Sequence, residues 1–418
     1  MSTAFSLVFA TVLLLVVALQ FWLALRQIRS VSSHAGEVPA AFADSIAPEQ
    51  HRRAAEYTVA KKRLGIAEDA WAAVVVVALT LLGGLQQLNT AVTSALGHGL
   101  AAQVAIVAAT LLLLTLLQVP ADLWRQFRIE QRFGFNRMTW SLYFADAAKS
   151  LLVTVAFGLP LLALVLWLMQ RAGALWWLYA WAAWMVVAMA LQFVFPVWIA
   201  PLFNRFTPLA DEALRERIDS LLQRTGFAAR GVFTMDGSRR SSHGNAYFAG
   251  MGRSRRIVFF DTLLQRLDAG EIEAVLAHEL GHFRLRHVTK RIAWSAVASL
   301  AALALLGWLA GTTWFYEGLG VEPRIDGGNE GVALTLFLLV APVFSFVVAP
   351  LGSLLSRRHE YEADAFAAAQ TTPAALVSAL TKLYRDNAST LTPDPLHSAF
   401  FDSHPPASLR IARLQAAA

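Results

Sequence analysis

Three residues in one short segment have the types and the spacing that metal-dependent hydrolysis requires. The segment EAVLAHELGHFRLRH (273–287) contains His278, Glu279 and His282 in the pattern H-E-x-x-H. On a helix, residues four apart lie on one face, so both imidazoles can bind a single Zn²⁺ ion. Glu279 follows the first histidine and is placed to act as general base on water that the metal activates. The competing interpretation is a solvated helix face that carries the pattern by chance.

A third ligand is expected, because a catalytic zinc ion usually has three protein ligands and one open position. The best candidate segment is SRRHEYEADAFAAA (356–369), where Glu360 and Asp364 share one face of a predicted helix. Glu360 would complete a His₂Glu site for one zinc ion per chain, and Asp364 would accept the second N–H of a ligand histidine. The alternative is a solvated helix with charge pairs. Glu362 and His287 lie off the ligand face, and His287 is interpreted as interfacial or structural.

The composition of the chain indicates that these residues belong to a membrane protein. Of the 418 residues, 56% are hydrophobic and only 15% are charged, and the mean hydropathy is +0.50. A soluble domain is typically about 25% charged. Cysteine is absent, which excludes disulfides, thiolate metal ligands and cysteine nucleophiles. The net charge of +6 fits basic loops beside a membrane, so no nucleic-acid partner is expected.

Seven apolar segments are long enough to cross a bilayer, since a span needs about 20 residues. They cover residues 5–25, 70–88, 101–119, 151–170, 174–199, 292–314 and 332–352. Lysine and arginine collect in the loops 26–69 and 120–150, whereas the loop 315–331 has one arginine against four acidic residues. By the positive-inside rule the N-terminus lies outside and the C-terminus inside. This orientation places the polar segments 200–291 and 353–418 in the cytoplasm.

The predicted fold is a mostly α-helical, polytopic membrane protein with four regions in chain order. Residues 1–199 hold the first five transmembrane helices, and residues 292–352 hold the sixth and seventh. Residues 200–291 form a cytoplasmic α+β domain that carries the H-E-x-x-H helix, and residues 353–418 complete the metal site from the same side. Within the α+β domain we expect a helix at 211–224, strands at 231–236, 245–250 and 255–262, and a capping box at Asp268 and Glu271.

With both metal-binding segments in place, the sequence resembles the type I CAAX prenyl endopeptidases, integral-membrane zinc metalloproteases of the gluzincin kind. The likeness rests on seven ordered blocks, at residues 127–140, 199–209, 241–250, 255–264, 276–287, 356–367 and 402–414. It implies a seven-helix membrane barrel around a water-filled chamber, with the zinc metalloprotease domain on the cytoplasmic side. It also implies zinc ligation by His278, His282 and Glu360, a catalytic base at Glu279, and support of a ligand histidine by Asp364.

The resemblance further implies how a peptide would be held beside the zinc ion. Asn245 and Ala246, in the segment N-A-Y-F, would bind the substrate backbone as an added strand. His404 and Arg410 would hydrogen-bond near the scissile carbonyl and stabilise the oxyanion, as donors aimed at developing charge do. From the residues alone, Asn245 could equally be a turn residue, His404 a loop residue before two prolines, and Arg410 a cation on a helix face.

These observations predict a zinc-dependent endopeptidase in the inner membrane of a bacterium, with its active site facing the cytoplasm. Its substrates would be peptides or protein tails that enter from the cytoplasmic side or the bilayer. The physiological substrate, its prenylation and the oligomeric state are left open. The compact, alanine-rich chain favours the bacterial source.

Three other functions are considered beside this prediction. An HtpX-type stress protease also fits a membrane zinc peptidase, but that type generally has fewer spans and lacks the S-H-P-P block at 403–406. A metal transporter would place ionisable residues within its spans, where this chain has almost none. A non-catalytic zinc scaffold would have no use for Glu279.

Overall fold

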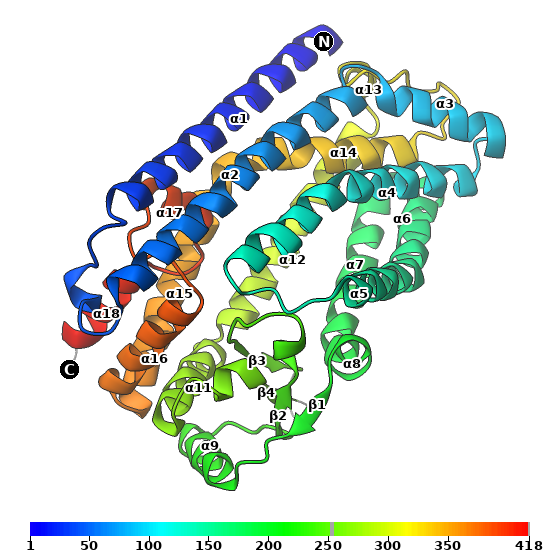
Figure 1. The fold of residues 1–418 in the computed structure, drawn as a ribbon. Helices are drawn as coiled ribbons and strands as arrows, with labels where there is room; N and C mark the ends of the chain where they lie inside the picture. The colour runs from blue at the N-terminus through cyan, green and yellow to red at the C-terminus, as the bar shows by residue number, and fades with distance from the viewer. Residues whose placement is uncertain (251–254, 417–418) are drawn as a thin grey trace.

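The computed structural model describes residues 1–250 and 255–416, which form a bundle of long helices with a smaller α/β part at one end (Figure 1). The helices of the bundle are α1 (Ser2–Ser33), α2 (Pro48–Leu79), α3 (Gly84–Leu96), α4 (Leu100–Trp124), α5 (Trp140–Val153), α6 (Leu159–Arg171), α7 (Trp176–Val194), α8 (Ala200–Phe203), α12 (His287–Leu309), α13 (Thr313–Glu317) and α14 (Glu330–Ser345). The α/β part comes from the middle of the chain and is completed by C-terminal helices.

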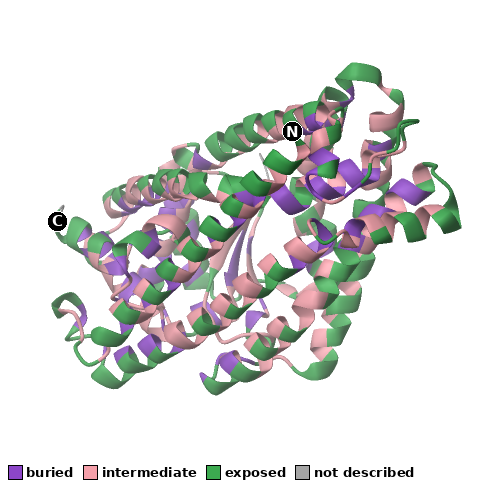
Figure 2. Cartoon of the chain, turned by 90° about the horizontal axis from the view of Figure 1, so that it is seen from above, coloured by how far each residue is buried: buried purple, intermediate pink, exposed green. Residues whose placement is uncertain are grey.

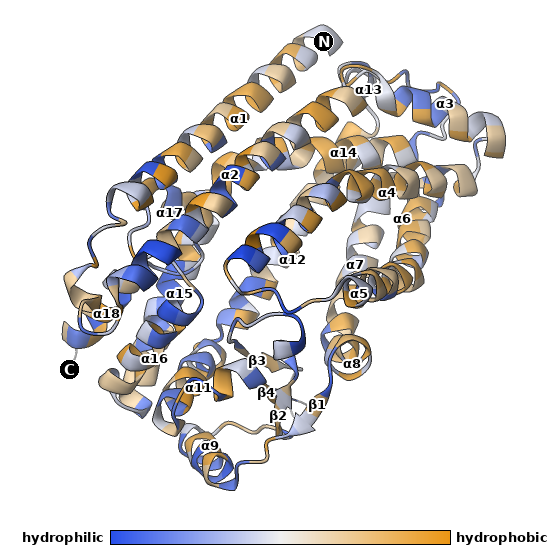
Figure 3. Cartoon of the chain, in the orientation of Figure 1, coloured by the Kyte–Doolittle hydropathy of each residue, from blue (hydrophilic) through white to orange (hydrophobic). Residues whose placement is uncertain are grey.

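Six helical segments of the described chain are long and apolar enough to cross a membrane. A seventh is obtained when α2 and α3, which meet at a bend of 54°, are taken as one broken span. Much of the length of these helices is hydrophobic (Figure 3), and many helical residues are exposed (Figure 2). Leu14, Leu152 and Val186 are each 69% exposed, as expected for side chains that face lipid.

A buried apolar core holds the bundle together between α1, α2, α4 and α14. Leu85, Ile106 and Leu336 lie in this core with no exposed surface. One polar contact fixes the start of α14 against α4: the buried amide oxygen of Gln103 accepts a hydrogen bond of 2.8 Å from Gly331 N. The last span is therefore anchored near its beginning, on the side away from the α/β part.

The α/β part is built on a four-stranded sheet in the order β1-β2-β4-β3. Its elements are β1 (Phe206–Pro208), α9 (Glu212–Thr225), β2 (Val232–Met235), β3 (Ala246–Ala249), β4 (Arg256–Phe260), α10 (Asp261–Leu264) and α11 (Ala269–Arg284). The strands β2 and β4 are parallel, while β1 and β3 pair antiparallel with their neighbours. The strand β3 is an edge of the sheet, so one side of its backbone is open to an added strand.

The helix α11 begins at a capping box, as the sequence predicts. Asp268 Oδ1 accepts from Glu271 N and Glu271 Oε2 accepts from Asp268 N, both at 2.9 Å, which satisfies two backbone donors at the helix start. One face of α11 then packs into a core that contains Ile272, Leu276 and Leu280. The opposite end of α11 carries the H-E-x-x-H residues.

The helix α15 (Ala349–Gln370) brings the second half of the metal site to α11. It follows α14 after a single turn of 3-10 helix, so one nearly continuous helical segment runs from the membrane into the α/β part. Beyond it, α16 (Pro373–Asp386), α17 (Pro395–Phe401) and α18 (Ala407–Ala416) pack around α15. The site is therefore positioned by how closely α15 approaches α11.

Gly281 sets that approach, and replacing it tests the packing. A Cβ atom at Gly281 would lie 3.0 Å from Ala363 Cα and 3.2 Å from Phe366 Cβ, so the two helices would have to separate. We expect Gly281→Ala to destabilise the protein by about 1–3 kcal/mol, as overpacking does, and to lower its melting temperature in detergent. Gly65→Ala is the matched control, because Gly65 also lies in a helix but nothing is within 4 Å of its Cβ position. An unchanged melting temperature for Gly281→Ala would contradict this account.

Candidate active site

Two histidines of α11 and one glutamate of α15 converge on a single point. His278 Nε2 and His282 Nε2 lie 3.3 Å apart. Glu360 places Oε2 at 3.4 Å from the first imidazole and Oε1 at 3.3 Å from the second. One ligand atom from each of the three residues lies within 4.8 Å of the others. This is the arrangement expected when three side chains share one metal ion.

The chemistry of this cluster fits a bound zinc ion. Two imidazoles and a carboxylate are the donor set of a catalytic zinc site with an open fourth position. Glu360 Oε2 is buried and accepts no hydrogen bond from the described residues, although His278 Nε2 and Arg410 Nη1 both lie within 3.5 Å. A buried carboxylate oxygen without a hydrogen bond is costly, and the guanidinium group of Arg410 lies near this oxygen without donating to it. A metal ion would satisfy both Glu360 and the two imidazoles.

A buried ion pair holds His278 from behind. Its Nδ1 lies 2.9 Å from Asp364 Oδ1, and Asp364 accepts two hydrogen bonds from Arg410, at 2.8 and 2.6 Å. Burial lowers the pKa of His278, but the carboxylates of Asp364 and Glu360, which lie beside its two ring nitrogens, outweigh burial and raise the pKa to about 9. The carboxylates around His278 therefore stabilise a positive charge at this position. The charge can be that of a protonated imidazole or that of a bound metal ion.

Glu279 lies on the wall of a cavity of about 840 Å³ that reaches the metal-binding cluster. Burial raises the pKa of this carboxyl group, while the nearby His278 and His282 oppose the increase. A carboxylate with a raised pKa accepts a proton more readily, which suits a general base. The H-E-x-x-H pattern thus places a carboxyl group on the same cavity as the candidate metal ligands His282 and Glu360.

His287 and Glu362 also belong to the site, although sequence reasoning left both of them outside it. His287 Nδ1 lies 3.1 Å from His282 Nδ1, and His287 Nε2 lies 3.0 Å from Glu362 Oε2. The chain reverses between α11 and α12 at Arg286, which has a positive φ of 58°. Helical periodicity does not hold across such a turn, so it could not predict the position of His287. The only indication in the sequence that Glu362 belongs to the site was its nearness to Glu360.

The candidate substrate strand presents part of its backbone at the open edge of the sheet. Phe260 N donates to Asn245 O at 3.0 Å, and the alternation of an antiparallel pair then turns the N–H and C=O groups of Ala246 and Phe248 away from β4. Asn245 Oδ1 accepts from Ala246 N at 2.8 Å in this structure. An added peptide strand would compete with that side chain for the same N–H group.

His404 and Arg410 occupy different surroundings. The His404 side chain is 62% exposed and lines the cavity, with Nε2 at 3.5 Å from Glu360 Oε1. Arg410 is only 5% exposed, and its guanidinium group is directed at Asp364. Burial lowers the pKa of Arg410, but the hydrogen bonds that it donates to Asp364 and the nearby Glu360 raise the pKa above its ordinary value, so Arg410 stays charged. The geometry favours a donor role toward substrate for His404 and a positioning role for Arg410.

Comparison with known proteins gives the family. The family model described as Peptidase family M48 matches residues 208–418, and the one described as CAAX prenyl protease N-terminal, five membrane helices, matches residues 27–205. The chain belongs to peptidase family M48. Its predicted kinship with the CAAX prenyl proteases and its class as a metalloendopeptidase are thereby confirmed. The match over residues 27–205 favours this group over the HtpX-type alternative, and a peptidase family argues against a transporter or a scaffold.

Individual relatives extend the likeness to the whole chain. CAAX prenyl protease 1 of Saccharomyces cerevisiae is 36% identical and covers 72% of this chain and 69% of its own length. The CAAX prenyl protease 1 homolog of Mus musculus is 30% identical, with 98% and 95% covered. The crystal structure of S. mikatae Ste24p matches with a TM-score of 0.91 at 30% identity, covering 98% of this chain and 99% of that chain. The predicted fold, a chambered multi-pass helical membrane protease with a small sheet, is confirmed.

The contacts of His287 predict a measurable effect on metal binding. Glu362→Gln removes the charged acceptor of His287, which lies against His282, and such outer contacts are typically worth about 10–100-fold in metal affinity. We expect the zinc affinity of the purified variant to fall in this range, measured by competition with a chelator. Arg358→Ala is the control, because it removes only the exposed partner of Glu362. Equal zinc affinity in Glu362→Gln and the parent would show that His287 does not position His282.

Proposed function

We propose that this protein is a zinc-dependent endopeptidase that binds one zinc ion per chain and removes C-terminal residues from prenylated proteins. The observation that carries the proposal is the convergence of His278, His282 and Glu360 beside Glu279, in a cavity whose wall includes the edge strand β3. The relatives named CAAX prenyl protease 1 supply the substrate class. Processing of other membrane proteins or peptides is the alternative substrate class, if the source is a bacterium without prenylated proteins.

In the proposed mechanism each group of this chain has one task. The edge of β3 holds the peptide in an extended form through main-chain hydrogen bonds. Glu279 removes a proton from the attacking water, and the same proton passes to the leaving amine as the C–N bond breaks. His404 donates a hydrogen bond to the carbonyl oxygen as negative charge develops there. Zinc, when bound, supplies Lewis acidity that polarises the carbonyl and acidifies water.

The ligands themselves are held in place by the contacts behind them. Asp364 accepts from Arg410 and lies against His278, so this imidazole keeps one orientation. His287 does the same for His282 through Glu362. We infer that Arg410 acts by positioning and makes no contact with substrate.

We propose that the active site faces the cytoplasm and that substrates enter from there or from the membrane. The basic loops support this orientation. Arg26, at the end of the first span, donates to Asp394 in the C-terminal part at 3.2 and 2.8 Å, so the basic loops and the metal site lie at the same end of the bundle. The positive-inside rule places such an end in the cytoplasm. For a bacterial source, the membrane would be the inner membrane.

Replacing the proposed base tests the reaction. Glu279→Gln keeps the three metal ligands but cannot accept a proton, so we expect cleavage of a farnesylated peptide that ends in a CAAX sequence to fall by at least roughly 10²–10⁴-fold. The measurement is the release of the C-terminal tripeptide by the purified protein, with zinc content determined in parallel. Cleavage at the parent rate would refute the assignment of Glu279. The same peptide without its farnesyl group shows whether the lipid is recognised.

Replacing the third ligand tests the metal site itself. Glu360→Ala leaves two imidazoles, which we expect to be too few to retain zinc through purification, because catalytic sites use three protein ligands. Metal analysis of the purified variant provides the measurement. Glu212→Ala serves as the control, since Glu212 is exposed on α9 and pairs only with Arg215. If Glu360→Ala retains one zinc ion per chain, the third ligand is another residue.

A further inference from the structure

A second cavity, of about 880 Å³, lies next to the active-site cavity and shares five residues with it: Tyr247, Phe248, Phe283, Val288 and Arg291. Four arginines line this second cavity, which we call the arginine cavity: Arg255, Arg284, Arg286 and Arg291. Its lining includes no aspartate or glutamate among the residues that the structure describes. The cavity therefore gathers four positive charges without a negative charge in its wall.

Little in the described structure compensates these charges. On the nearby helix α9, Arg217 and Arg224 both pair with Glu273, but the ion pairs of the described residues include no partner for Arg284, Arg286 or Arg291. The fourth arginine, Arg255, lies at the back of the cavity between aromatic rings. Its guanidinium carbon is 4.7 Å from the Phe227 ring and 5.3 Å from the Phe283 ring, and its Nε is buried without a hydrogen bond. Arg284, Arg286 and Arg291 are exposed, so their guanidinium groups are accessible to an anionic ligand that enters the cavity, and such a ligand would supply the negative charge that the described wall lacks.

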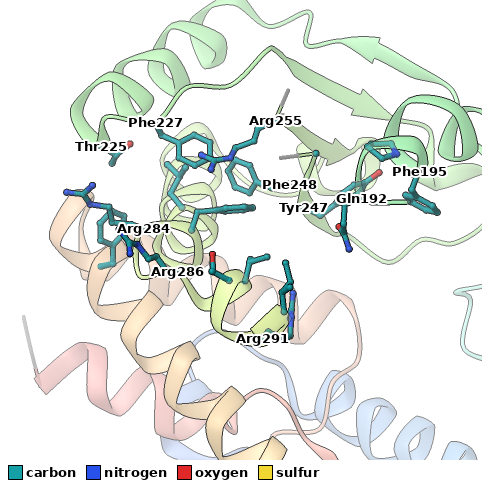
Figure 4. Close-up of a pocket in the computed structure, with 18 of the residues that line it drawn as sticks. Gln192, Phe195, Thr225, Phe227, Tyr247, Phe248, Arg255, Arg284, Arg286 and Arg291 are labelled. Atoms are coloured by element: carbon teal, nitrogen blue, oxygen red, sulfur yellow. The ribbon is translucent and has the colours of Figure 1, made fainter. Parts of the chain in front are cut away.

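Part of the remaining lining is apolar and comes from two membrane spans. Leu191 and Phe195 come from the end of α7 and the turn after it, and Ile292 comes from the first turns of α12. The two spans are joined deeper in the bundle, where Trp181 Nε1 donates to Ala296 O at 2.9 Å. Figure 4 shows Arg284 and Arg286 on one side of the cavity, with Gln192 and Phe195 on the other. The cavity thus lies where α7 and α12 leave the membrane, with a cationic side and an apolar side.

We propose that the arginine cavity binds an anionic phospholipid. The phosphate of the headgroup lies among the guanidinium groups of Arg284, Arg286 and Arg291, which donate to phosphate in a fixed geometry. The acyl chains extend along Leu191, Phe195 and Ile292 toward the membrane. A free phosphate ion would make no use of the apolar side, and an acidic peptide would have no need of a place between two spans.

Lipid binding to the full-length protein in detergent tests the proposal, with native mass spectrometry as the measurement. The probes are dioctanoyl phosphatidylglycerol, dioctanoyl phosphatidylcholine, inorganic phosphate and a short peptide rich in glutamate. We expect the anionic lipid to bind more tightly than the other three probes. The triple variant Arg284→Gln, Arg286→Gln, Arg291→Gln should bind it on the order of 100-fold more weakly, at roughly fivefold for each charge removed.

The control separates this cavity from general attraction between basic proteins and anionic lipids. Arg128→Gln removes an exposed arginine of the basic loop that does not line the cavity, and we expect unchanged binding. Parent-like zinc content in the triple variant shows that it is folded, and the three single variants, each weaker by about fivefold, replace it if it is not. The proposal is wrong if the arginine variants bind like the parent, or if phosphate or the acidic peptide binds as tightly as the lipid. Because the readout is binding, its outcome does not depend on peptidase activity.

Discussion

The close contact between α11 and α15 is the constraint on which the rest of the structure depends. Neither helix holds a complete site: one contributes His278 and His282, and the other contributes Glu360. Gly281 allows the two backbones to approach, and it lies within the H-E-x-x-H pattern itself, on the side turned toward Ala363. Since α15 continues the last membrane span, the position of the carboxylate ligand is fixed by the packing of the whole bundle. The membrane helices are therefore part of the machinery that assembles the site.

Contacts between side chains of alternating charge keep the assembled site ordered. Taking an ion pair out of water is costly unless both partners are fully hydrogen-bonded. Arg410 donates to both oxygens of Asp364, and Oδ1, one of these two oxygens, also lies 2.9 Å from His278 Nδ1. Glu362 and His287 make a second, more exposed chain of contacts to His282. Each imidazole of the candidate metal site thus has a carboxylate behind it, Asp364 directly for His278 and Glu362 through His287 for His282.

The sequence predicts those parts of this arrangement that follow from local periodicity. The spacing of four residues places His278 beside His282, and the same rule places Glu360 above Asp364. The capping box at Asp268 and the apolar runs are likewise local signals. The strand β1 was not predicted, because three residues are too few for a pattern.

The contacts that the sequence could not predict depend on burial and on how the chain turns between helices. Arg410 and His404 are near one another in the chain, and only the structure reveals that one is enclosed and the other exposed. The role of His287 is hidden for a different reason, because the turn at Arg286 ends the helical register that links His278 to His282. Contacts of this kind depend on the direction in which the chain leaves a helix, which residue spacing does not encode.

One aromatic cluster lies between the arginine cavity and the active-site cavity, so a ligand in one cavity can influence a ligand in the other. The rings of Phe227, Phe248 and Phe283 lie 5.0–5.6 Å apart. Phe248 belongs to the proposed substrate strand, and Phe283 directly follows His282 in α11. Phe227 and Phe283 also lie against the guanidinium group of Arg255, so the aromatic cluster adjoins both the arginine cavity and the strand edge. Close-packed side chains transmit displacement to their neighbours. A lipid bound in the arginine cavity and a peptide bound at β3 would therefore both affect the positions of the same aromatic rings.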